Sequence, residues 1–127
     1  MTTVAEIDDL VTNARNSGCN DLTLLKCTSS YPATLLEGSN LMTIPHIKEL
    51  FHCRVGLSDR TLGIGSTVWL LLVAIIALDG TVIEKHFTLS RAEGGVDSVF
   101  SFELDEMKWH CWCVNVTQHG MVRPYKL

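Results

Sequence analysis

The chain has 127 residues, of which 46% are apolar and 19% are charged. This length and composition favour one globular domain and exclude a disordered or collagen-like protein. The net charge is −4 and no cluster of Lys and Arg is present, so we expect no nucleic-acid partner.

The first residues predict a helix and no secretory signal. Thr3 and Glu6 have the spacing of a capping box, Ile7 and Val11 follow on one helical face, and Gly18 is expected to end the helix. Acidic residues at positions 8 and 9 stand where a signal peptide would be apolar, so we expect a cytoplasmic protein.

Two strands and a helix are expected next. Residues 22–27 (LTLLKC) predict a strand, and residues 28–40 (TSSYPATLLEGSN) predict a loop. The apolar spacing within 44–51 predicts a helix, with Pro45 tolerated in its first turn. Residues 53–58 (CRVGLS) predict the second strand.

The longest apolar run, residues 68–78, has eleven residues. A membrane-spanning helix needs about 20 apolar residues, so this run predicts a buried helix from about residue 62 to 78, and we expect no membrane partner. A turn at Asp79–Gly80 and a third strand over residues 81–87 (TVIEKHF) follow.

Helices and strands therefore alternate, and the strands begin near residues 22, 54 and 81. This alternation predicts an α/β fold with about three parallel βα units. In α/β sheets and barrels, function gathers at the carboxyl ends of the strands. The three strand ends read KCTSSYP, GLSDRT and EKHFT, and all are polar.

The third strand end carries the strongest candidate residues. Glu84 and His86 are two residues apart, so alternation along a strand directs both to one face, where they could bind a metal or exchange a proton. The structural alternative is a histidine that only satisfies a strand terminus. Ser58 and Asp59 are helix-capping residue types before the apolar helix, and Asp97 ends GGVD, a sequence typical of a solvated turn.

The five cysteines are an odd number without paired zinc-ligand spacing, so we interpret them as reduced thiols. Trp109 and Trp112 are three residues apart, which indicates a last helix. One hypothesis for this segment is a small thiol or metal binder. Its ligands would be Cys111, Cys113, His110 and His119.

Six motifs together resemble the sialic acid synthase family, which includes N-acetylneuraminate and pseudaminic acid synthases. They are LLKCTSSYP, IPHIKELF, VGLSD, TLGIG, VIEKHFTL and GGVDSVFSFE, in the family's order. The resemblance implies that residues 1–106 are a partial (β/α) TIM-type barrel, namely its last three βα units. Residues 107–127 have no counterpart that we can place and are expected to be a divergent tail.

The resemblance also implies a reaction, in which phosphoenolpyruvate condenses with an open-chain N-acylated amino sugar with the help of a divalent metal, Mn²⁺ or Mg²⁺. His86 matches a metal-ligand histidine with a catalytic role, Glu84 the catalytic acid beside it, and Asp97 an acid that contacts the sugar. Three further residues match the loop that lines the sugar pocket. They are Thr28, Ser29 and Tyr31.

The chain departs from the family pattern in two respects. Arg60 stands where the family has its other metal-ligand histidine, and a guanidinium cannot bind a metal ion. Three strands also cannot close a barrel, and open sheet edges favour association. We therefore expect a synthase fragment that is inactive alone and self-associates or needs a complementing chain. The alternative is a non-catalytic α/β remnant that acts through protein association.

Overall fold

The computed structural model describes residues 2–27, 40–62 and 66–122, with the backbone alone described at 66–69 and 118–122. The described elements alternate between helix and strand and confirm the predicted α/β fold. In chain order they are α1 (Val4–Asn16), β1 (Thr23–Cys27), α2 (Thr43–Phe51), β2 (Arg54–Asp59), α3 (Ser66–Ala77), β3 (Val82–Lys85), the short 3₁₀ helices η1 (Arg91–Glu93) and η2 (Ser98–Phe100), and α4 (Leu104–Val122).

Helix α1 begins as its sequence predicts. The Thr3 hydroxyl accepts a hydrogen bond from the Glu6 amide, and the Glu6 carboxylate accepts one from the Thr3 amide, which completes the capping box. Gly18, just beyond the helix, has a φ of +90°. The Arg15 guanidinium donates to the carbonyl oxygen of Phe51 at 2.5 Å and so ties α1 to the end of α2.

The three strands form one parallel sheet in the order β1-β2-β3. The left-handed backbone of Asp79, with a φ of 63°, makes the predicted turn before β3. Close approach of the strands requires glycine at position 56. An added Cβ there would collide with the carbonyl group of Val82 and lie 2.9 Å from a methyl group of Leu25.

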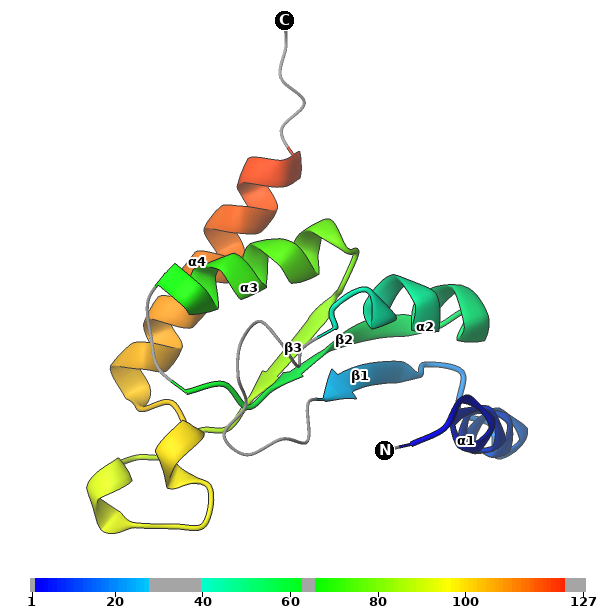
Figure 1. Ribbon diagram of the computed structural model, residues 1–127, viewed down its shortest axis with the longest axis horizontal. Helices are drawn as coiled ribbons and strands as arrows, with labels where there is room; N and C mark the ends of the chain where they lie inside the picture. The colour runs from blue at the N-terminus through cyan, green and yellow to red at the C-terminus, as the bar shows by residue number, and fades with distance from the viewer. Residues whose placement is uncertain (1, 28–39, 63–65, 123–127) are drawn as a thin grey trace, which may run out of the picture.

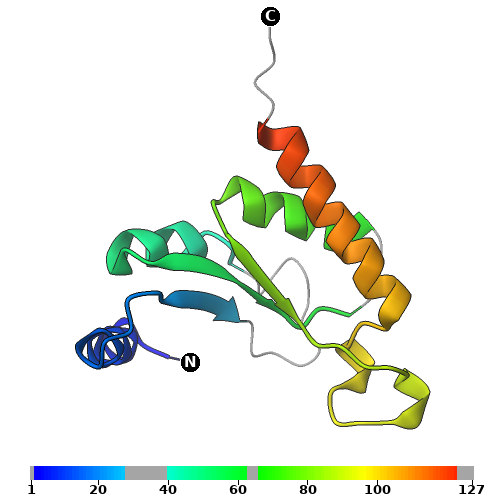
Figure 2. The same cartoon turned by 180° about the vertical axis from the view of Figure 1, so that it is seen from behind.

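Helices α2, α3 and α4 lie on one side of the sheet, whereas no described helix covers the opposite face (Figures 1 and 2). Two apolar clusters fill the covered side. The first contains Ile44, Val55, Leu57, Leu71 and Ile75. The second contains Leu72, Phe102 and Cys113 and lies under α4. On the opposite face, Leu25 and Cys27 of β1 are exposed.

Three expectations differ from the structure or extend beyond it. Leu62 lies outside a helix, and the described part of the apolar helix runs from Ser66 to Ala77. Ser58 and Asp59 belong to β2, so the interpretation of these residues as helix caps is wrong. Helix α4 runs continuously across residue 106, and the separation of a tail at that point stays a prediction. Among the described residues, no helix is long and apolar enough to cross a membrane.

Candidate functional site at the carboxyl ends of the strands

The open face of the sheet carries a polar row at the carboxyl ends of the strands. The parallel register aligns Cys27 with Ser58 and Ser58 with Glu84. The Ser58 hydroxyl donates a 2.6 Å hydrogen bond to the Glu84 carboxylate. Because neighbouring residues of a strand point to opposite faces, Glu84 and His86 project away from the helix-covered core. Glu84 is thus held in place by the backbone of its own strand, β3, and by a side chain of β2.

His86 follows β3 directly, and its side chain meets the loop that precedes α4. Its Nδ1 atom lies 3.7 Å from Oδ2 of Asp97, a distance that makes an ion pair when the imidazole is protonated. The Phe100 ring stands edge-on to the imidazole, with the ring centres 6.2 Å apart. The backbone carbonyl of His86 accepts a hydrogen bond from the Phe102 amide at 2.8 Å. The structure therefore brings His86 and Asp97 together across eleven residues of chain.

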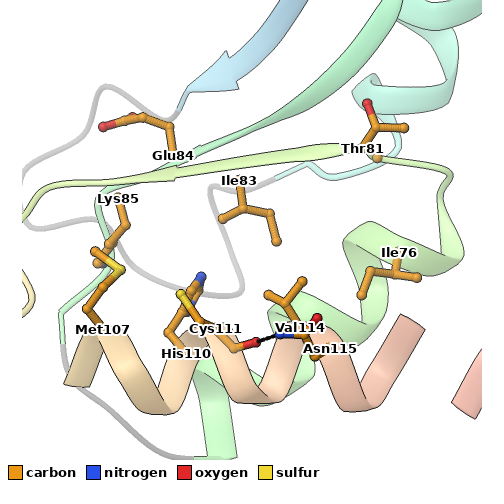
Figure 3. A pocket seen from close by; sticks show the side chains of 11 residues that line it. Ile76, Thr81, Ile83, Glu84, Lys85, Met107, His110, Cys111, Val114 and Asn115 are labelled. Atoms are coloured by element: carbon orange, nitrogen blue, oxygen red, sulfur yellow. Dashed lines mark hydrogen bonds between the residues drawn. The ribbon is translucent and has the colours of Figure 1, made fainter. Parts of the chain in front are cut away.

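Lys85 lies between Glu84 and His86 in sequence, and its side chain points to the helix-covered side of the sheet (Figure 3). Figure 3 shows Glu84 and Lys85 on opposite sides of β3, with Lys85 directed toward α4. The Lys85 ammonium lies 3.0 Å from the Asp59 carboxylate, and both side chains are at least 98% buried. It also donates to the Thr61 carbonyl at 2.6 Å and lies 4.6 Å from the centre of the Phe102 ring. This pair is structural, and the sequence analysis missed it.

A signal for the buried pair is present in the sequence. Asp59 is two residues beyond Leu57, and Lys85 is two residues beyond Ile83, so each charged residue continues the core-facing series of its strand. The register then pairs Asp59 with Lys85. Once the register is known, opposite charges at matched positions of two buried series indicate such an ion pair.

The remaining predicted site residues are placed only in part. Thr28, Ser29 and Tyr31 lie outside the described residues. Arg60 follows Asp59 of β2 as His86 follows Lys85 of β3, and those two predecessors are paired in the register. The backbone therefore brings Arg60 and His86 to the same level of the sheet.

The described residues contain no group of three or more His, Cys, Asp or Glu that could hold a metal ion. Cys113 is fully buried and packs with Leu72 and Phe102, whereas Cys111, two residues earlier, is exposed. Residues two apart on a helix do not face each other, so the two thiols do not converge. Burial among apolar groups raises the pKa of the Cys113 thiol. The hypothesis of a thiol or metal binder gains no support from the described part of α4.

A cavity of about 530 Å³ lies between the outer edge of β3 and helix α4. Figure 3 shows Ile83 and Lys85 on its strand side and Met107, His110 and Val114 on its helix side. β3 is paired with β2 alone among the described strands, so this edge of the sheet is open. The cavity thus borders the open edge of the sheet.

Comparison with known proteins agrees with this architecture. The sequence pattern that defines the NeuB family matches residues 1–118. The chain belongs to the NeuB family. The match runs past residue 106 and well into α4.

Two relatives define the neighbourhood within the family. The chain is 47% identical to the pseudaminic acid synthase of Campylobacter jejuni over 88 residues, which are 69% of this chain and 24% of that protein. It is 36% identical to the N,N'-diacetyllegionaminic acid synthase of the same species over 123 residues, which are 95% of this chain and 35% of that protein. The resemblance to sialic and pseudaminic acid synthases is confirmed.

The fold comparison gives the same result. All of this chain superposes on 42% of the N-acetylneuraminic acid synthetase of Leptospira borgpetersenii, with a TM-score of 0.81 and 26% sequence identity. The three parallel strands and their helices thus match part of the TIM-type barrel of that synthetase. The chain spans between about a quarter and two-fifths of the length of these relatives.

Proposed function

We propose that this NeuB-family chain contributes one wall of a synthase active site that condenses phosphoenolpyruvate with an N-acylated amino sugar. The observation that carries the proposal is the convergence of Glu84, His86 and Asp97 at the carboxyl ends of β2 and β3, on the face that no described helix covers. In barrel enzymes this end of the strands holds the active site.

The proposed reaction needs groups that move protons. A carbon–carbon bond forms between C3, the methylene carbon of phosphoenolpyruvate, and the aldehyde carbon of the sugar, whose oxygen then takes up a proton. Water adds to C2, the carbon that carries the phosphate, and loses a proton. The bond between C2 and the phosphate oxygen then breaks, so that C2 becomes a carbonyl and phosphate leaves with the remaining hydroxyl proton. Glu84, held by Ser58, and His86, beside Asp97, are positioned to exchange these two protons.

The metal ion that the resemblance implies fits the described residues poorly. His86 contributes one imidazole, Arg60 adds positive charge at the same level, and no group of three ligands is present among the described residues. We propose that position 60 limits the affinity for Mn²⁺ or Mg²⁺. Arg60→His is expected to strengthen Mn²⁺ binding in an equilibrium titration, and an unchanged affinity would remove position 60 from the site.

The proposed activity requires the rest of a barrel. β1 and β3 are each paired with one described strand, so both outer edges can accept another chain. We propose self-association or a complementing chain as the way in which these edges are covered. Size-exclusion chromatography of the chain over a range of concentrations is expected to show species larger than a monomer.

The test of function uses the chain assembled with the part of the C. jejuni pseudaminic acid synthase that precedes the region this chain matches. This assembly is incubated with Mn²⁺, phosphoenolpyruvate and N-acetylmannosamine or an N-acylated amino sugar of the pseudaminic type, and phosphate release is measured. The proposal expects release that needs both partners and the sugar. Release that is absent with every sugar, from an assembly that forms, would favour the alternative of a non-catalytic remnant.

A further inference from the structure

The loop of residues 86–103 leaves the sheet after β3 and returns beside it (Figure 1, yellow). At its base, the Phe102 amide donates to the carbonyl of His86 at 2.8 Å, and the Thr88 amide donates to the carbonyl of Phe102 at 2.9 Å. The two ends of the loop are therefore fixed together at the carboxyl end of β3. The position of Asp97, near the middle of the loop, must depend on further contacts.

A bidentate ion pair supplies such a contact. The Arg91 guanidinium donates to both carboxylate oxygens of Glu106, at 2.5 and 2.6 Å. Glu106 lies in the first turn of α4, is buried, and also accepts a hydrogen bond from the Glu103 amide at 2.8 Å. A fork of two parallel bonds fixes orientation as well as distance. The bond from Arg91 lowers the pKa of Glu106, so the carboxylate stays charged.

Hydrogen bonds continue from this pair to the candidate site. Arg91 also donates to the backbone carbonyl of Ser101 at 3.0 Å. The Ser101 hydroxyl donates to the backbone carbonyl of Asp97 at 2.7 Å. The Asp97 carboxylate then lies 3.7 Å from Nδ1 of His86. Glu106, on the rigid helix α4, is thus connected to His86 through a continuous series of side chains and short backbone links.

We infer that Arg91 is a positioning residue that holds Asp97 beside His86 by way of Ser101. Arg91 acts through its neighbours, as residues behind an active-site group do when they fix its orientation. A catalytic importance of Arg91 rests on the proposed function. Its contacts with Ser101, and those of Ser101 and Asp97, do not depend on that function.

The test follows the imidazole nitrogen resonances of His86 by NMR at one fixed pH, without metal or substrate. Asp97→Asn gives the reference shift for loss of the carboxylate. Arg91→Gln is expected to produce more than half of that shift, and Arg91→Lys, which keeps the charge but loses the fork, an intermediate one. Lys108→Gln is the matched control, because its ammonium binds the exposed Asp105, at 3.0 Å, and it should leave the resonances in place.

Circular dichroism shows which variants keep the parent fold. If Arg91→Gln unfolds, the milder Arg91→Lys and Ser101→Ala carry the test, and both should shift His86 in the direction of Asp97→Asn. Resonances that stay at the parent position in these two variants, while Asp97→Asn moves them, would overturn the inference. A graded shift in a chain whose assembly releases no phosphate would reject the proposed function and leave the positioning role intact.

Discussion

Helices cover one face of the sheet, whereas no described helix covers the other (Figures 1 and 2). On the covered face, Val55 and Leu57 are buried beneath α2 and α3, and the buried charges of Lys85 and Asp59 neutralise each other. On the open face, Leu25 and Cys27 are exposed and the polar row of Ser58 and Glu84 has no described helix above it. The covered face is a closed apolar core, whereas the open face is the side on which we propose the functional site.

Consecutive side chains of β3 point to opposite faces of the sheet, so neighbouring residues contribute to different faces (Figure 3). Glu84 and Lys85 are both charged, yet one lies on the open face with Ser58 and the other is sealed against α4. Loss of the first should therefore affect chemistry, and loss of the second should affect stability. The following variants test that division, beginning with the largest expected change in stability.

Lys85→Ala should give the largest loss of stability. It leaves Asp59 charged and buried without its partner, which typically costs about 3–5 kcal/mol. Urea unfolding followed by circular dichroism measures the change. Lys108→Ala removes an exposed ion pair with Asp105 and should cost ~0–1 kcal/mol. Equal, small losses in both variants would contradict the division between the faces.

Gly56→Ala should cause the next largest loss of stability, because β2 approaches β3 closely at this position. The added methyl group collides with the Val82 carbonyl, and overpacking of this kind costs about 1–3 kcal/mol. Gly95→Ala is the control, since its nearest neighbouring atom, the Ser98 Cβ, is 3.9 Å away. It should leave the urea midpoint almost unchanged. A tolerated Gly56→Ala would mean that the strands are further apart.

A smaller effect should appear when the pH is lowered. Burial lowers the pKa of His110, which lies against the Phe102 ring and near Lys85 and Asp59. The unfolded chain binds a proton at the ordinary histidine pKa of about 6.5, so below that pH it holds more protons than the fold. Stability should be complete above this value and fall as the pH drops toward the lowered pKa. His110→Gln should flatten this part of a stability–pH curve, and an unaltered slope would contradict the burial.

The sequence could predict the covered face more fully than the open one. The capping box and the apolar periodicity identified α1, and the strands predicted over residues 53–58 and 81–87 overlap β2 and β3. Asp59 was misinterpreted as a helix cap because its pairing with Lys85 depends on register. Register is a tertiary property, so it becomes visible only when two strands are aligned.

The open face depends even more on tertiary structure. Strand alternation predicted that Glu84 and His86 share a face, and this stays a prediction for His86 because β3 ends at Lys85. The approach of Asp97 to His86 depends on the folding of the intervening loop, which Arg91 ties to α4. A spacing of eleven residues through two glycines has no period from which this contact could be deduced.

The most direct test of the account compares Glu84→Gln with the parent in the assembled enzyme, with phosphate release and the urea midpoint measured on the same preparations. Removal of a group that transfers a proton typically lowers turnover by about 10²–10⁴-fold, whereas Glu84 lies outside both apolar clusters. The account predicts a loss of turnover in that range with a nearly unchanged midpoint. Parent turnover in Glu84→Gln would contradict it.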